Sequence, residues 1–204
     1  SDINIYNKLN KDAILLGELV CINTGVVAHS RKGSPIKFKK NDVIYSTYKE
    51  SYKKYVVGSH IKRYSIIFNS QYIDYESNQD YFHRPKYKLL FESPKIIVRR
   101  ISGENNSLIC CYDDEKYYSN DNLMHLVLWN NEILKHQRPE KRWNVKRDGS
   151  IHLKYILTIL CSNTMKYFFS KFLSTDTLQG SYSSIYPEDL RVFPIKNIDI
   201  NKQQ

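Results

Sequence analysis

Hydrophobic side chains between residues 95 and 129 follow the spacing of β-strands. Residues 95–101 (KIIVRRI) form an apolar, β-branched run with charged ends, which is typical of a strand buried on both faces. Turn-forming residues separate this run from two further strand-like runs, at residues 107–112 and 123–129. The pattern therefore predicts a central strand over residues 95–101 with antiparallel neighbours.

The first half of the chain carries shorter and weaker patterns. Residues 15–22 are predicted to form a short strand or a turn that leads into a strand, and residues 29–35 follow as a polar, basic loop that contains a glycine and a proline. Two apolar runs at residues 60–68 and 72–75 lie on either side of a short polar turn, which predicts a β-hairpin. A short helix is expected over residues 84–91.

The last third of the chain changes to a helical period. Apolar residues recur at helical spacing across residues 153–173, and Ser162 and Asn163 interrupt the pattern, as the start of a second helix would. This predicts two helices that form a hairpin. A one-turn helix at residues 187–190 and an extended segment at residues 192–195 follow.

Strands thus precede helices, and no strand–helix–strand alternation or internal repeat is present. This order predicts an α+β fold with a twisted, mostly antiparallel or mixed β-sheet followed by a C-terminal helical hairpin. A chain of 204 residues is long enough to bury a substantial core, and we expect residues 1–204 to form a single domain.

The net charge narrows the choice of partners. The formal charge is +10, and such a basic chain favours a polyanion. The 17 tyrosines, with many lysines, asparagines and isoleucines, indicate an AT-rich genome, which inflates the lysine count and reduces the weight of the charge. No apolar run is long enough for a membrane span, so we expect a cytoplasmic protein without a membrane partner. The four cysteines have no C-x-x-C spacing and are expected to be reduced thiols.

Known catalytic motifs are missing. There are seven glycines and no G-x-G or P-loop sequence, so neither a methyl-donor site nor a nucleotide site is expected. Asp114, Glu115 and Lys116 match part of a metal-dependent nuclease motif, but a charged hairpin turn explains them better. The six histidines form no i, i+4 pair and are expected in loops or on the surface. We therefore expect no catalytic residue, bound metal or cofactor.

Two segments carry a family resemblance. Residues 57–64 (VGSHIKRY) and residues 90–101 (LFESPKIIVRRI) resemble the TaqI-like C-terminal specificity domain. An acidic turn after residue 111, a strand with a histidine at 123–127, a helix at 155–163 and an apolar exit at 190–195 follow in the same order. That family is found in adenine-specific DNA methylases and in type IIG restriction-modification enzymes, and specificity subunits of type I systems carry related domains.

The resemblance implies a target-recognition domain that binds double-stranded DNA at specific sequences. Methylation and cleavage would then come from methyltransferase and endonuclease domains of the same protein or complex, of which residues 1–204 would be a fragment. Three alternatives stay open: one half of a type I specificity subunit, a metal-dependent nuclease that uses Asp114 and Lys116, and an RNA-binding module with exposed tyrosines.

Basic and polar loops supply the candidate DNA contacts. Phosphate contacts give affinity and register, whereas contacts to base edges give sequence choice. The candidates for phosphate contact are Arg31, Lys32, Lys37, Lys39, Lys40, Lys53, Lys54, Lys62 and Arg63, and at least one of Arg99 and Arg100 is expected to point outward. Gln179, Ser181 and Tyr182 lie in a polar loop and are the candidates for contact with base edges. A second basic cluster consists of Lys135, Arg138, Lys141, Arg142, Lys146 and Arg147.

Overall fold

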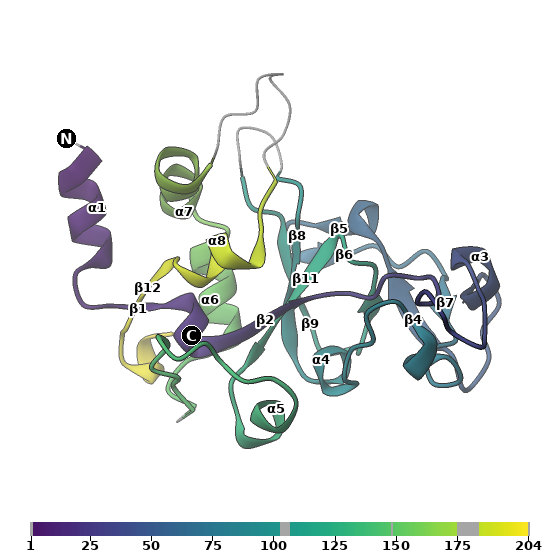
Figure 1. Ribbon diagram of the computed structural model, residues 1–204. Coiled ribbons are helices and arrows are strands. Elements are labelled where there is room, and N and C mark those ends of the chain that lie inside the picture. The colour runs from purple at the N-terminus through teal and green to yellow at the C-terminus, as the bar shows by residue number, and fades with distance from the viewer. Residues whose placement is uncertain (1, 103–106, 148, 175–183, 204) are drawn as a thin grey trace.

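A four-stranded antiparallel sheet forms the centre of the protein. The computed structural model describes residues 2–102, 107–147, 149–174 and 184–203. The strand order is β2-β11-β8-β9 (Figure 1), and the strands are β2 (Val20–Thr24), β11 (Leu123–Leu128), β8 (Lys95–Arg99) and β9 (Cys110–Asp113). Ile97 is fully buried and pairs with His125 on one side and Cys111 on the other. The prediction of a buried central strand in this segment is confirmed.

Helices cover one face of this sheet. Helix α6 (Leu153–Leu160) and helix α7 (Asn163–Phe168), which continues as a π-helical turn over Phe169–Leu173, pack against it. The two helices are separated at Ser162, whose hydroxyl accepts a hydrogen bond from the Met165 N–H at 3.1 Å and so caps α7. The predicted break and the C-terminal helical hairpin are confirmed.

The first and last strands of the protein pair beside these helices. Strand β12 (Pro194–Lys196) follows the predicted short helix α8 (Pro187–Arg191) and pairs antiparallel with β1 (Ala13–Leu15). Helix α1 (Asp2–Asn10) lies beyond them, at the left of Figure 1. The sequence analysis predicted no helix at α1, which is short and buries none of its residues.

The opposite face of the central sheet carries a second, mixed sheet. Its order is β10-β4-β7-β3, with strands β10 (Tyr118–Ser119), β4 (Lys53–Val56), β7 (Tyr72–Ile73) and β3 (Ile44–Tyr45). The β10–β4 pair is parallel and the others are antiparallel. At Gly25, just after β2, the backbone passes close to Asn120, which follows β10 of the second sheet. A Cβ atom at Gly25 would lie 2.3 Å from the Asn120 carbonyl oxygen. Only glycine fits this crossing.

The expected hairpin between residues 60–68 and 72–75 is wrong. Instead, β5 (Ile61–Lys62) pairs with β6 (Ser65–Ile66), and β7 pairs with β3 and β4. The turn at Tyr64 has a φ of 70°, a backbone conformation that a tyrosine does not signal in a sequence.

Other short elements also depart from the sequence reading. A helical turn, α2 (Leu16–Leu19), interrupts the expected strand at 15–22, and the helix expected at 84–91 is reduced to α4 (Leu89–Glu92). The remaining helical segments of the described residues are α3 (Lys40–Val43), α5 (Asn131–His136) and the 3-10 turns Gly58–His60, Gln79–Tyr81 and Ile200–Lys202. No helix in the described ranges is long and apolar enough to cross a membrane.

Candidate nucleic-acid interface

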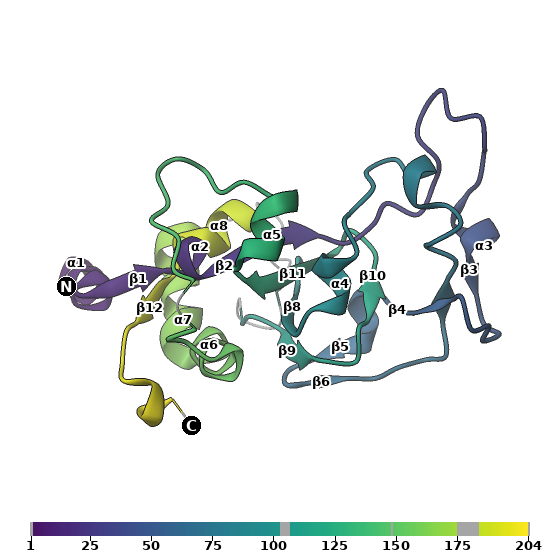
Figure 2. The ribbon, with the colours of Figure 1, turned by 90° about the horizontal axis from the view of Figure 1, so that it is seen from below.

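A long basic loop projects between β2 and α3. Both ends of the loop contact Phe82, which lies in another segment. Ser30 forms a β-bridge with Phe82, and the rings of Phe38 and Phe82 have centroids 5.0 Å apart. Phe38 and Phe82 are buried, whereas Arg31, Lys32, Lys37 and Lys39 of the loop are exposed. In Figure 2 the loop extends from the body of the molecule at the upper right. A fixed base with exposed cations at its tip suits contact with a charged polymer.

Helix α5 and the segment after it carry the second basic cluster. Asn130 caps α5, because its side chain accepts a hydrogen bond from the Ile133 N–H at 2.8 Å. Two cations of this cluster are paired with carboxylates, Lys135 with Glu132 at 2.6 Å and Arg142 with Glu140 at 2.8 Å. Arg138, Lys141 and Arg147 are exposed and have no ion-pair partner within the described part of the chain.

Polar and ring contacts join β2 and the segment at residues 86–87 to α5 and the residue that follows it. The rings of Tyr87 and His136 stack at a centroid distance of 5.0 Å. Lys86 Nζ donates a hydrogen bond to Asn23 Oδ1 at 2.7 Å, and Asn23 Nδ2 donates to Gln137 Oε1 at 3.4 Å. The basic loop is linked to the same part of the chain, because the Arg31 N–H donates a hydrogen bond to the Tyr81 carbonyl oxygen at 2.9 Å; Figure 2 shows α5 near the centre and the loop at the upper right.

We call this surface the α5 face. At the loop end of the face, the rings of His29 and His83 lie 5.0 Å apart, and the His83 N–H donates to the His29 carbonyl oxygen at 2.9 Å. The face comprises Asn23, His29, Arg31, Lys32, His83, Arg84, Lys86, Tyr87, Lys135, His136, Gln137 and Arg138.

Lys86 is half-buried beneath the α5 face and binds Asn23 of β2. Burial lowers the pKa of its ammonium group, and the neighbouring Arg84 lowers it further. The carboxylate of Asp121 acts in the opposite direction. Its hydrogen bond to Asn23 holds the strand edge of β2 beside the segment that leads into α4. Arg84 and Lys86 are not among the candidate DNA contacts predicted from the sequence, which placed both in a short helix over residues 84–91.

The predicted lysines of β4 are already paired. Lys53 Nζ lies 3.0 Å from a carboxylate oxygen of Glu76, and Lys54 Nζ lies 2.6 Å from one of Glu115. Glu76 also pairs with Lys88 at 3.0 Å, and these cations lower the pKa of Glu76. Each pair reduces the charge that β4 can offer to a phosphate.

The other predicted contacts lie elsewhere on the molecule. Lys62 and Arg63 belong to the β5–β6 hairpin, and the Arg63 guanidinium donates a hydrogen bond to the Cys161 carbonyl at the α6–α7 junction. Arg99 and Arg100, at the end of β8, are half-buried, and the Arg100 guanidinium lies 5.1 Å from the centre of the Tyr186 ring. Lys40 begins α3. Gln179, Ser181 and Tyr182 lie outside the described residues. For all these residues, DNA contact stays a prediction.

The acidic segment at the end of β9 stabilises the fold through Asp113. Asp113 is buried and its carboxylate lies 2.5 Å from Lys95 Nζ. The same carboxylate accepts hydrogen bonds from the backbone N–H groups of Glu115 at 2.8 Å and Tyr117 at 3.0 Å. Among the residues that the structure describes, no three His, Cys, Asp or Glu side chains are grouped as a metal ion would require.

The expectation that all histidines lie in loops or on the surface is wrong for two of them. His125 is fully buried in β11, where its Nε2 atom lies 2.6 Å from Ser119 Oγ and its ring meets Phe91 edge-on. His60 is also buried. Both have apolar neighbours in the sequence, and the sequence alone does not show whether a histidine in such a segment points toward the core or toward solvent. The four cysteines are buried and free of disulfides.

Comparison with known proteins identifies the family. The model of the TaqI-like C-terminal specificity domain matches residues 53–195, which is more than half of the chain. The chain belongs to this family. None of the curated proteins matches it.

The HsdS subunit from Thermoanaerobacter tengcongensis is a solved structure similar to this chain, with 10% sequence identity and a TM-score of 0.49. The match covers 99% of this chain and 40% of that subunit. The chain thus spans well under half the length of the protein it matches.

Proposed function

We propose that this chain recognises a specific sequence in double-stranded DNA as the target-recognition domain of a restriction-modification enzyme. Membership of the specificity-domain family over residues 53–195 is the observation that carries the proposal. The net charge of +10 supports it, because DNA binding requires cations that displace counterions from phosphates.

The α5 face is our candidate for the DNA-contacting surface. Arg31, Arg84 and Arg138 are exposed there and have no ion-pair partner among the described residues, so their charge is available to phosphates. The loop around Arg31 projects from a rigid base, which suits entry into a groove. Lys53 and Lys54 are paired with carboxylates and should contribute less.

We further propose that catalysis is supplied elsewhere. Residues 1–204 would be one domain of a longer protein or complex, with methyltransferase or endonuclease domains as its partners. A type IIG enzyme is our first choice for the parent protein, and one half of a type I specificity subunit is the alternative.

Selection of DNA by the purified chain tests the proposal. The chain is mixed with a pool of duplexes that contain a random central segment, bound DNA is recovered and amplified, and the cycle is repeated. We expect one short motif to be enriched, and duplex of that motif to bind more tightly than its separated strands. A pool that stays random, or tighter binding of single-stranded DNA or RNA, would contradict the proposal.

A further inference from the structure

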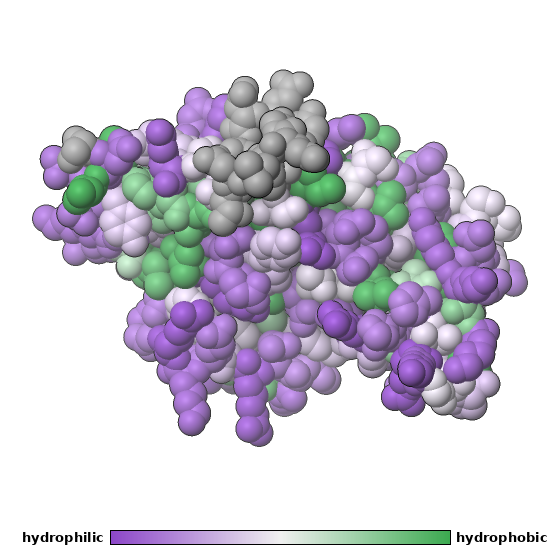
Figure 3. Space-filling view, turned by 45° about the horizontal axis from the view of Figure 1, so that its top comes forward, coloured by the Kyte–Doolittle hydropathy of each residue, from purple (hydrophilic) through white to green (hydrophobic). Residues whose placement is uncertain are grey.

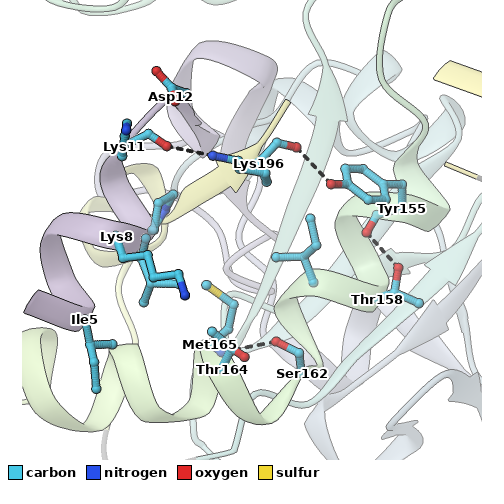
Figure 4. A pocket seen from close by; sticks show the side chains of 13 residues that line it. Ile5, Lys8, Lys11, Asp12, Tyr155, Thr158, Ser162, Thr164, Met165 and Lys196 are labelled. Atoms are coloured by element: carbon cyan, nitrogen blue, oxygen red, sulfur yellow. Dashed lines mark hydrogen bonds between the residues drawn. The ribbon is translucent and has the colours of Figure 1, made fainter. Parts of the chain in front are cut away.

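An open groove lies between α1 and the helical hairpin. It has a volume of about 990 Å³. Figure 4 shows Ile5 and Lys8 from α1 on one side of it, with Thr158, Thr164 and Met165 from α6 and α7 opposite. In Figure 3 a band of hydrophobic side chains lies at the left of the molecule, where Figure 1 places these helices. The groove is therefore an apolar hollow on a largely hydrophilic surface.

Helix α1 forms a firm wall of this groove. The Tyr6 ring packs against Phe172 with centroids 5.1 Å apart and against Phe168 at 6.0 Å. The Tyr167 hydroxyl donates a hydrogen bond to the Asp2 carboxylate at 2.7 Å. Although these contacts fix α1, Ile5 is 43% exposed toward the groove and Ile3 is 70% exposed. The helix thus presents apolar surface that no described part of the chain covers.

Three hydroxyl groups that line the groove already have partners within the chain. The Tyr155 hydroxyl donates to the Lys196 carbonyl oxygen at 2.8 Å, and the Thr158 hydroxyl donates to the Tyr155 carbonyl oxygen at 2.8 Å, as Figure 4 shows. The Ser162 hydroxyl accepts the capping hydrogen bond of α7. An occupant would therefore be held by apolar contact in the groove and by charge at its rim.

The rim of the groove is positively charged. Lys8, Lys11 and Lys196 line it, and Asp12 is the one acidic residue among the lining side chains of the described chain. Lys8 and Lys11 are exposed and have no ion-pair partner in the described ranges. The charge at this rim is complementary to a partner that places acidic side chains beside an apolar stripe.

We propose that the groove is the docking site for an amphipathic α-helix of a protein partner, with acidic side chains flanking its apolar stripe. An α-helix with its side chains is about 10 Å wide and rises 1.5 Å per residue, so the groove volume fits roughly two turns. Anchors at i, i+3, i+4 and i+7 would span that length. A second copy of this chain fits less well, because two such lysine rims would face each other and repel.

The groove lies far from the candidate DNA-contacting loop. Figure 1 places α1 at one end of the molecule and α3, which follows the loop, at the other. A helix bound in the groove would leave the loop accessible. The proposal does not depend on DNA binding, and its test can succeed or fail independently of the proposed function.

Binding of a designed peptide to the whole chain tests this proposal. The probe is a fluorescent amphipathic peptide of about four turns, with leucines at helical spacing and glutamates beside them. The matched probe carries lysines in place of the glutamates. We expect the glutamate peptide to bind at least about tenfold more tightly than the lysine peptide by fluorescence anisotropy.

Paired variants locate the binding site. Ile5→Asp should weaken binding of the glutamate peptide by about tenfold or more, because it places a carboxylate in the groove. Ile3→Asp is the matched control, since it makes the same change on the same helix outside the groove lining, and should have little effect. The double variant Lys8→Glu with Lys11→Glu should reverse the preference between the two peptides, whereas Lys171→Glu should not.

Four results would overturn the proposal. These are equal binding of the two peptides, equal effects of Ile5→Asp and Ile3→Asp, displacement of the peptide by duplex DNA, and sedimentation of the chain as a dimer that Ile5→Asp dissociates. The third would assign the rim to nucleic acid, and the fourth would assign the groove to a second copy. Unfolding curves of all variants confirm that the comparison is made between folded proteins.

Discussion

The two faces of the central sheet are packed with different chemistry. On the face toward α6 and α7, the core is apolar: side chains such as Ile96, Val98 and Leu126 meet Leu160 and Phe168. The opposite face, toward the second sheet, combines apolar and aromatic side chains with buried polar pairs. There the two sheets are joined by directed contacts as well as by packing.

The polar pairs occur where the second sheet and α4 meet the central sheet. Lys95 and Asp113 form a fully buried ion pair, His125 meets Ser119 of β10, and the Tyr118 hydroxyl donates to Glu92 at 2.9 Å. Apolar packing is insensitive to direction, whereas each polar pair requires one geometry. The helix-covered face therefore supplies mainly stability. We infer that the polar face also fixes the orientation of the second sheet, to which the basic loop leads through α3.

The largest effect is expected from the buried ion pair. Burial lowers the pKa of Lys95, and the Asp113 carboxylate opposes that shift. Asp113→Ala would leave the ammonium group buried without its counter-charge and remove the acceptor for two backbone N–H groups. We expect the free energy of unfolding, measured with urea at neutral pH, to fall by about 3–5 kcal/mol.

The matched control for Asp113→Ala is Glu115→Ala, in the same turn. Its pair with Lys54 is exposed, with 42% and 61% of the two side chains accessible. An exposed pair contributes less than about 1 kcal/mol. Equal losses in the two variants would show that the distinction between buried and exposed charge on this face is wrong.

The apolar face should respond in stability alone. Leu160 is fully buried between α6 and the sheet, so Leu160→Ala should lower the free energy of unfolding by about 2–5 kcal/mol. The affinity of the folded variant for its preferred duplex should stay within about twofold of the unmodified chain. A folded Leu160→Ala protein that selects a different DNA sequence would contradict the division of roles between the faces.

A smaller, pH-dependent effect is expected from His125. Burial holds its pKa well below the ordinary value, and the charges of Lys95 and Lys86 lower it further. The unfolded chain therefore binds a proton more readily than the folded one. Stability contributed by neutral His125 is complete above about pH 6.5 and is lost as the pH falls, by at most about 1.4 kcal/mol per pH unit.

Urea unfolding across pH 5 to 8 measures this effect of His125. His125→Gln should flatten the decline toward acid pH. His60→Gln is the comparison, because burial also lowers the pKa of His60 but to a lesser extent. If the His125 variant keeps the full slope, proton uptake occurs at other groups.

Strong periodicity explains which elements could be predicted from the sequence. Residues 96–98 and 123–128 are mainly apolar and rich in residues that favour strands, so both strands carry a clear signal. The alternation of Ile96, Ile97 and Val98 between two cores follows from the period of a strand. The break at Ser162 was predictable because serine favours the start of a helix.

Elements formed by distant contacts could not be predicted. The second sheet consists of strands of two to four residues, too short to show a period, and its β10–β4 pair joins residues that lie more than sixty positions apart in the sequence. The same limit applies to the α5 face. Arg31 and Arg138 are recognisable as cations, but their placement on one surface depends on Asn23, Lys86 and Gln137, whose contacts the sequence does not reveal.

The salt dependence of DNA binding tests the central claim most directly. The slope of log K against log salt is measured for the unmodified chain, for Arg31→Ala with Arg84→Ala on the α5 face, and for Lys171→Ala with Lys202→Ala at the helical end. Each lost phosphate contact should flatten the slope by about 0.9, so the first pair should flatten it by about 1.8 and the second should leave it unchanged. Flattening by the second pair alone, or by neither, would contradict the assignment of the α5 face to DNA.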